Sequence, residues 1–267
     1  MNFDSLSIVG PALLAGILVL ATHVPLGREV LGRGIIFIDL AVAQIAGLGV
    51  IAANGFGLET HGVAAQVAAF AAALAGGLLL SWTDRRFGKV QEAIIGVSFV
   101  LAATGGILLL ANDPHGGEEL RDLLVGQILF IDRHTLVPAA VLAAVVLASW
   151  RLVMRTFGRA GFYVLFAISV TASVQLVGVY LVFASLMVPA LATRSLRKHA
   201  LAAGYAVGLV GYLIGLLLSA VFDLPTGAVI VVSLLLTFIV AVVISLIAPV
   251  RSRAATPQTA ENWNDGV

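Results

Sequence analysis

Charged residues are scarce in this chain of 267 amino acids, of which Asp, Glu, Lys and Arg together make up 11%. A soluble domain carries roughly 25% charged residues, and the 60% hydrophobic content of this chain leaves too few polar residues to cover a water-facing surface. Disordered chains and coiled coils are excluded for the same reason, since both need many more polar residues. The composition therefore predicts an integral membrane protein.

Several motifs that would carry chemistry are also missing. The chain has no cysteine, which excludes disulfides and thiolate metal sites. It has no H-E-x-x-H, no G-x-S-x-G and no G-x-x-x-x-G-K-[ST], so it carries no metalloprotease or serine hydrolase signature and cannot bind ATP through a P-loop. A net charge of +1 gives no basic field that would attract nucleic acid. We therefore expect neither an enzyme nor a nucleic-acid-binding protein.

The apolar residues lie in long continuous runs, such as VAAQVAAFAAALAGGLLLSW and VIVVSLLLTFIVAVVISLI. Each run is near the ~20 residues that a helix needs to cross ~30 Å of hydrocarbon, and neither shows the alternating polarity of a transmembrane β-strand. The sequence predicts an all-α polytopic membrane protein with about nine membrane helices. The expected spans lie near residues 8–25, 34–53, 62–82, 93–111, 135–154, 161–176, 177–193, 200–220 and 226–248.

Two segments do not fit the pattern of one straight span. The apolar stretch over 161–193 is too long for one straight span, so we divide it near Gly178 into two short helices. The segment LLVGQILFI at 123–131 is too short to span, and we expect it to be re-entrant or to lie on the membrane interface. Residues 1–249 then form one transmembrane domain, and the polar tail over 250–267 is expected to be cytoplasmic and disordered.

The basic residues predict the orientation of the chain. With the N-terminus outside and nine spans, 13 of the 15 basic residues fall in inside loops, and only Arg121 and Arg133 fall outside. Basic residues concentrate on the cytoplasmic side of membrane proteins. The outside loops are acidic by contrast. The sequence therefore predicts an N-out, C-in topology.

Polar residues within the predicted spans are candidates for function. Asp39 lies five residues into the second span, where a carboxylate costs about 2.5–3.5 kcal/mol on insertion scales, so it is either functional or interfacial and paired with Arg33. Gln44 lies about 140° further around an α-helix, so the two side chains do not converge on one ion, and an interhelical hydrogen bond is favoured. Glu92 is expected to cap the fourth span at its cytoplasmic end, with coupling or gating as the alternative.

Small residues predict close helix packing in the eighth span. Gly204, Gly208, Gly211 and Gly215 follow each other at steps of four, three and four, which keeps them on one helix face. A neighbouring helix backbone can approach such a face closely.

The order of these segments resembles the ABC-type zinc/manganese uptake permeases. The matching features are VG at 177–178, LMVPALAT around Pro189 with the basic loop after it, and SAVFDLPTGAVIV at 219–231. Upstream, RGIIFIDLAVAQIAGLGV, EAIIGVSFVLAATGGILLL and LLVGQILFI also look like that family. The resemblance covers roughly residues 10–135 and 170–248.

The resemblance implies a function and a set of partners. It implies a multi-pass permease subunit of the inner (plasma) membrane that pairs as a dimer and moves a divalent metal ion, Zn²⁺ or Mn²⁺, by alternating access. An extracytoplasmic binding protein would deliver the metal, and a separate cytoplasmic ATPase would drive transport. This chain would bind no cofactor of its own.

The sequence departs from the family pattern in two places. The second helix of the family carries an Asp followed four residues later by His, whereas here the nearest equivalents are Asp39 and Gln44. The segment RTFGRAGFY at 155–163 is short and basic, without the acidic docking segment of the family, which leaves Arg155 and Arg159 as coupling candidates. Two alternatives therefore stay open: an uncoupled metal transporter or channel, and a non-transporting accessory subunit.

Overall fold

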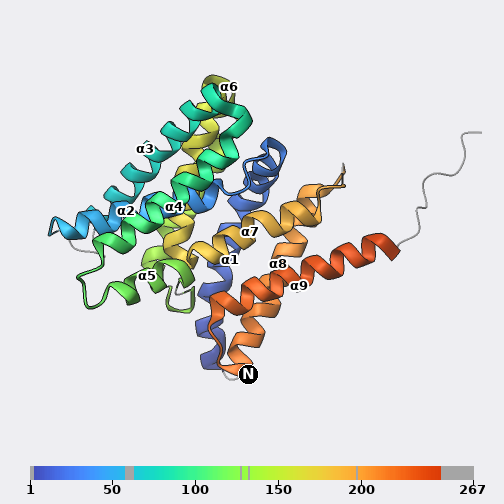
Figure 1. Ribbon diagram of the computed structural model, residues 1–267. Coiled ribbons are helices and arrows are strands. Elements are labelled where there is room, and N and C mark those ends of the chain that lie inside the picture. Colours follow the sequence, from blue (N-terminus) through green and yellow to red (C-terminus); the bar gives the residue numbers. More distant parts are fainter. Residues whose placement is uncertain (1–2, 58–62, 127, 132, 197, 248–267) are drawn as a thin grey trace, which may run out of the picture.

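The computed structural model describes residues 3–57, 63–126, 128–131, 133–196 and 198–247. This part of the chain contains helices and no strand (Figure 1). Its α-helices are α1 (Phe3–Arg33), α2 (Ile38–Gly55), α3 (Val63–Phe87), α4 (Gln91–Leu109), α5 (Gly116–Val125), α6 (Arg133–Val177), α7 (Val179–Ala192), α8 (Ala200–Phe222) and α9 (Thr226–Ile247), with 3-10 turns η1 (Gly88–Val90) and η2 (Ile128–Phe130). The predicted all-α class is confirmed.

Six helical stretches among the described residues are long and apolar enough to cross a membrane. Two of them, Val63–Leu109 and His134–Val177, are 47 and 44 residues long, about twice the ~20 residues that one span needs. The shorter apolar helix α7 adds to these six. A multi-pass membrane protein is therefore confirmed, while the count of nine spans and the N-out orientation stay predictions. The predicted tail at 250–267 lies outside the described residues.

The first helix is longer than predicted, because Pro25 does not end it. A proline inside a helix leaves the carbonyl four residues earlier without its N–H donor. Here that carbonyl belongs to Ala21, and the hydroxyl of Tyr205 on α8 donates a hydrogen bond of 3.1 Å to it. Helix α1 therefore continues past the predicted end of the span at residue 25, to Arg33.

Glycines with positive φ set two chain reversals. Gly158 (φ 53°, ψ −120°) divides α6 into two arms that fold back on each other, so the predicted separation of 135–154 from 161–176 is confirmed. Apart from Gly158, the expected loop at 155–163 is helical. Gly178 (φ 80°) separates α6 from α7, as predicted.

A contact between backbones holds the end of α5 against the break at Gly178. Gly126 (φ 68°) lies against Val177 and Gly178 so closely that a Cβ atom at either glycine would overlap the other backbone. The segment predicted as one element at 123–131 is therefore divided: Leu124 and Val125 end α5, and Ile128–Phe130 form η2. Whether this segment is re-entrant or interfacial stays a prediction.

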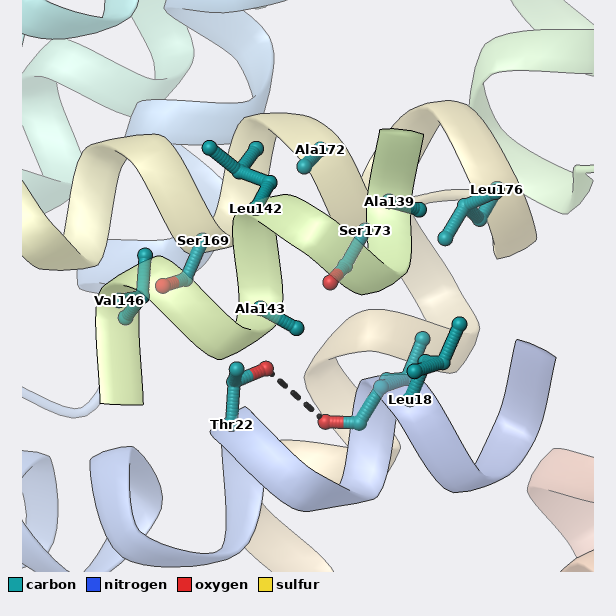
Figure 2. Close-up of a pocket in the computed structure, with 11 residues that line it drawn as sticks. Leu18, Thr22, Ala139, Leu142, Ala143, Val146, Ser169, Ala172, Ser173 and Leu176 are labelled. Carbon is teal, nitrogen blue, oxygen red and sulfur yellow. Dashed lines mark hydrogen bonds between the residues drawn. The ribbon is translucent and has the colours of Figure 1, made fainter. Parts of the chain in front are cut away.

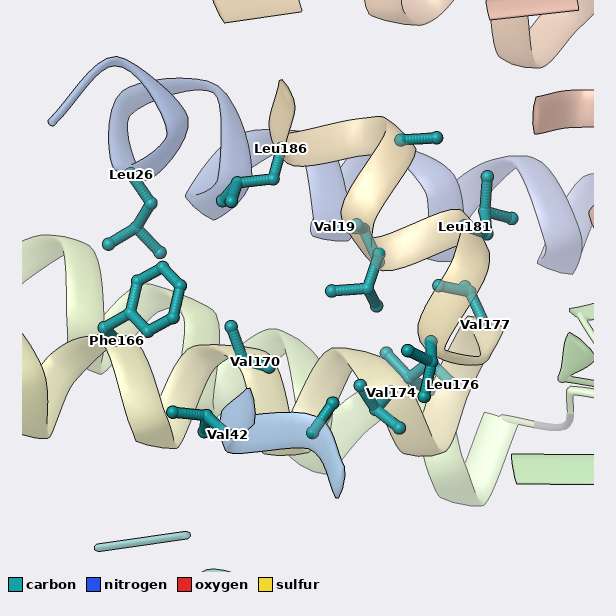
Figure 3. Packing of buried hydrophobic residues seen from close by; sticks show 14 of the residues in the cluster. Val19, Leu26, Val42, Phe166, Val170, Val174, Leu176, Val177, Leu181 and Leu186 are labelled. Carbon is teal, nitrogen blue, oxygen red and sulfur yellow. The ribbon is translucent and has the colours of Figure 1, made fainter. Parts of the chain in front are cut away.

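Helix α1 lies at the centre of the packing, against α6, α7 and α8. Figure 3 shows side chains from α1, α2, α6 and α7 meeting in one apolar cluster, which includes Val19, Leu26, Val42, Phe166 and Leu186. Helix α2 also packs against α3 and α4. The polar groups described below therefore lie on helices that pack around this apolar cluster.

The four glycines on one face of α8 allow close contact with two neighbouring helices, α1 and α9. A Cβ at Gly204 or Gly208 would come within 2.9 Å of Val24 or 2.5 Å of Leu20 on α1. Gly211 and Gly215 lie in the same way against Leu234 and Ile230 on α9, and all four glycines are buried.

Candidate functional site

Asp39 is the carboxylate that the fold buries most completely in the membrane helices. It lies in the first turn of α2 and is 1% exposed. Neither carboxylate oxygen has a hydrogen-bond partner of good geometry within the described residues, although the backbone N–H groups of Leu40 and Asp39 and the Glu92 carboxylate interact with it electrostatically. A buried unpaired carboxylate is costly and needs an explanation such as a bound ion.

The alternative that pairs Asp39 with Arg33 is wrong. The Arg33 guanidinium instead donates to Glu29 on its own helix, with the Nη2–Oε1 distance at 2.6 Å. The Cζ atom of the Arg33 guanidinium also lies over the Phe162 ring, 4.3 Å from the ring centre. Arg33 therefore fastens the end of α1 to the turn of α6, and Asp39 is left without this cation.

Glu92 lies in the first turn of its own helix, as predicted, but it makes no hydrogen bond that caps this helix. The N-cap of α4 is Val90, without a side-chain hydrogen bond. One oxygen of Glu92 accepts the backbone N–H of Phe37 at 3.2 Å, and Phe37 is the N-cap residue of α2. The other oxygen is buried with no hydrogen-bond partner among the described residues. Glu92 thus joins the start of α4 to the start of α2, two residues from Asp39.

Gln44 lies on a different side of α2 from Asp39. It is half-buried, while the buried face of α2 includes Asp39, Val42 and Ala46. As the spacing of five residues predicts, the structure does not bring the two side chains together on one face. A role for Gln44 as a metal ligand receives no support from this placement.

Arg155 and Arg159 flank the turn of α6, and both side chains are exposed. A guanidinium nitrogen of Arg159 lies 3.7 Å from a carboxylate oxygen of Asp84, near the end of α3. Together with the contact of Arg33 on Phe162, this ion pair gathers the ends of α1 and α3 and the turn of α6 at one end of the bundle. A partner that contacts this end would meet a basic surface.

Two buried polar residues were not predicted as candidates. Gln91 is 2% exposed, donates from Nε2 to the Leu80 carbonyl at 2.9 Å and lies 3.4 Å from the Tyr163 hydroxyl. His23 is 0% exposed, although its position near the end of the expected first span placed it near the inner face. The signal that could have located His23 is the apolar pattern after Pro25, which continues as helix.

Two cavities lie among the described residues close to polar side chains. A cavity of about 20 Å³, room for one water, lies between α1 and the two arms of α6, with Thr22, Ser169 and Ser173 in its wall (Figure 2). A larger pocket of about 310 Å³ lies between the C-terminal ends of α2 and α4, beside Asn54 and Asp113. The described residues contain no cluster of three or more His, Asp or Glu side chains that could hold a metal ion.

These features define a class of protein: a multi-pass helical membrane protein with a buried, unpaired carboxylate in its core. The chain belongs to the ABC 3 transport family, whose sequence model matches residues 5–162 and 156–245. Membership makes it a transporter permease rather than an enzyme, and it confirms the resemblance drawn from the sequence.

Solved structures share this fold. One is PsaBC from Streptococcus pneumoniae in complex with Fab, with a TM-score of 0.70 and 19% identity over 89% of this chain and 93% of that one. Another is an inward-facing conformation of a metal-chelate type ABC transporter, with a TM-score of 0.59 and 18% identity over 87% of this chain and 85% of that one. At these identities the likeness shows the fold alone.

Proposed function

We propose that this chain is the membrane permease of an ABC transporter that moves a divalent metal ion, Zn²⁺ or Mn²⁺, across the inner membrane. The observation that carries the proposal is the Asp39 carboxylate, which is 1% exposed and has no hydrogen-bond partner among the described residues. An ionisable side chain inside a membrane bundle marks an ion pathway by default, because its burial is otherwise only a cost. A carboxylate oxygen is a suitable ligand for both metals.

Transport proceeds by alternating access, in which Asp39 is exposed to one side of the membrane and then to the other. The chain has no P-loop, so ATP hydrolysis takes place on a separate cytoplasmic ATPase. The basic end around Arg155 and Arg159 faces that ATPase in the predicted orientation. An extracytoplasmic binding protein delivers the metal at the opposite end, where Asn54 and Asp113 border a pocket, and two permeases pair as a dimer.

The test is uptake of radioactive Mn²⁺ and Zn²⁺ by proteoliposomes that contain the permease with its co-purified ATPase. Loss of residues that merely orient metal ligands costs about 10–100-fold, so Asp39→Asn should lower ATP-dependent uptake by at least about tenfold. Glu118→Gln is the matched control, because this carboxylate is exposed on α5 and its substitution should leave uptake unchanged. Wild-type proteoliposomes that take up neither metal would contradict the proposal.

A second candidate function is uncoupled metal transport, which the turn of α6 favours. With α6 helical on both sides of Gly158, no separate docking segment projects between its arms. Uptake at the same rate with the permease alone would identify this function. Uptake that needs both ATP and the ATPase would eliminate it.

A further inference from the structure

One face of α3 is apolar and packs on no other helix among the described residues. Its exposed side chains follow each other at steps of four, four, three and four, which keeps them on one side of the helix; they are Val67, Ala71, Ala75, Leu78 and Trp82. The contacts of α3 with α2, α4 and α6 use the buried residues of its other faces, and Figure 1 shows α3 at the edge of the bundle. In a membrane protein such a face meets the lipid chains.

Trp82 lies at the depth where this face reaches the surface of the membrane. From Val63 to Trp82 the helix rises about 28 Å, close to the ~30 Å thickness of the hydrocarbon core. Tryptophan is enriched at this boundary, because indole combines a large apolar surface with an N–H donor. The Phe87 ring meets Trp82 edge-on, with ring centres 6.2 Å apart, and both rings are exposed. The two rings therefore mark the membrane interface.

Three basic side chains lie directly beyond Trp82, and we call Arg85, Arg86 and Lys89 the α3 basic surface. Arg85 and Arg86 are three and four residues after Trp82, so they continue its helix face by one turn. Lys89 belongs to η1, which follows α3. All three side chains are exposed, and none of them forms an ion pair with another described residue.

The acidic residues nearest in the sequence do not neutralise this charge. Asp84 has its carboxylate oxygen 3.7 Å from a guanidinium nitrogen of Arg159 on α6. Glu92 accepts the backbone N–H of Phe37 at the start of α2. The α3 basic surface therefore keeps its positive charge for a partner outside the chain.

A partner for this surface must supply negative charge at the membrane boundary. A phosphate group accepts paired hydrogen bonds from a guanidinium, and the acyl chains of a lipid would cover Trp82 and Phe87 at the same time. A zwitterionic headgroup brings a cation of its own, so a lipid with net negative charge fits better. Basic sites between membrane helices on the cytoplasmic side bind such headgroups.

We infer that the α3 basic surface binds the headgroup of an anionic phospholipid, such as phosphatidylglycerol, beside Trp82. This inference goes beyond the proposed function and does not depend on metal transport. A cytoplasmic protein partner would meet the basic residues but would not reach the lipid-facing side of Trp82, which lies at the edge of the hydrocarbon core.

The fluorescence of Trp82 tests the inference. Trp150→Phe and Trp263→Phe leave Trp82 as the only tryptophan of the full-length permease. Vesicles of phosphatidylcholine and phosphatidylglycerol in one fixed ratio are prepared with brominated acyl chains, which quench a neighbouring indole, on either one lipid or the other. Per molecule of lipid, brominated phosphatidylglycerol should be at least about fivefold more effective, since one cation near an anionic surface contributes a factor of about five.

Arg85→Gln/Arg86→Gln/Lys89→Gln, in the same single-tryptophan background, removes the charge and keeps polar side chains. The two brominated lipids should then quench Trp82 equally. In the starting protein, raising the salt concentration should reduce the preference for phosphatidylglycerol, because salt screens exposed charges.

The matched control is Arg151→Gln/Arg194→Gln/Lys198→Gln. It removes the same number of exposed cations, two arginines and one lysine, from α6 and from the segment after α7. The total charge falls equally in both triple variants. The preference for phosphatidylglycerol at Trp82 should therefore survive in this control.

Three outcomes would overturn the inference. The first is equal quenching by the two lipids in the starting protein; if Arg85→Gln/Arg86→Gln/Lys89→Gln then also weakens binding of the ATPase, the surface belongs to that partner. The second is a preference for phosphatidylglycerol that survives this substitution. The third is no quenching by either lipid, which would show that protein covers this face of α3. Metal uptake enters none of these measurements, so each of these results would leave the proposed function standing.

Discussion

At the scale of single residues, hydrogen bonding separates the polar side chains that support the fold from those that are free to bind an ion. Ser185 and Thr193 are both buried, and both hydroxyls bond within the bundle: Ser185 lies 2.8 Å from the Tyr212 hydroxyl, and Thr193 donates to the Pro189 carbonyl at 2.8 Å. Asp39 and the Nε2 atom of His23 have no such partner among the described residues. Burial alone is thus a weak sign of function, and burial without a partner is a stronger one.

Glu92 gives a prediction at this scale, because it bonds the start of a neighbouring helix. Glu92→Ala removes the acceptor of the Phe37 N–H and a negative charge at the start of α2, and it should lower the free energy of unfolding by about 1 kcal/mol. Glu92→Gln keeps an acceptor oxygen and should lose less. Unfolding in mixed micelles measures both variants. Equal stability of Glu92→Ala and wild type would show that this bond contributes nothing.

At the scale of helices, the glycines of α8 allow the backbone of α9 to approach closely. An alanine at Gly215 would place its Cβ 2.5 Å from the Cα of Ile230, and an alanine at Gly211 would place its Cβ 2.9 Å from the Cα of Leu234. Since a backbone must move, we expect each substitution to destabilise the α8–α9 pair by about 1–3 kcal/mol.

Gly96 on α4 is the matched control for these substitutions. A Cβ there would meet nothing within 4 Å, so Gly96→Ala should be neutral or stabilise by about 0.5–1 kcal/mol through its helix propensity. Unfolding in mixed micelles again measures the difference. Equal effects at Gly96 and Gly215 would contradict the close contact between α8 and α9.

The helices also show which parts of the fold the sequence could predict. Long apolar runs and glycine breaks act locally, so the break at Gly178 and the reversal within 155–163 were predictable. The end of α1 was not, because Pro25 is tolerated through Tyr205, which is 180 positions further along the chain and reaches the Ala21 carbonyl. For the same reason the sequence predicts that Glu92 caps its own helix, whereas its hydrogen-bond partner Phe37 is the N-cap residue of α2.

The candidate site was predictable only in part. Asp39 stood out because a carboxylate within an apolar run is rare, and the structure leaves it unpaired. His23 did not stand out, since the expected end of the first span placed it near the inner face. Which polar groups find partners depends on tertiary packing, and that packing decides between a structural and an ion-binding role.

At the scale of the whole molecule, opposite charges lie at opposite ends of the bundle. Arg33 and Arg159 contact residues at the turn of α6 or beside it. The arm of α6 after Gly158 ends at Val177, about 28 Å further along the helix. At that end Gly126, which follows the acidic helix α5, contacts the backbone of Val177. The basic and acidic loops that alternate along the sequence therefore also lie at opposite ends of the bundle, as the positive-inside rule predicts for an oriented membrane protein.

The absence of cysteine makes this orientation directly testable. Single cysteines can be introduced by His115→Cys, at the start of α5, and by Arg155→Cys, at the turn of α6, since both side chains are exposed. In intact cells a membrane-impermeant maleimide should label His115→Cys fully, and it should label Arg155→Cys only after the membrane is permeabilised. Wild-type protein is the control for background, because it offers no thiol. The reverse pattern would place the basic end outside and remove the ATPase from the surface proposed for it, because that partner is cytoplasmic.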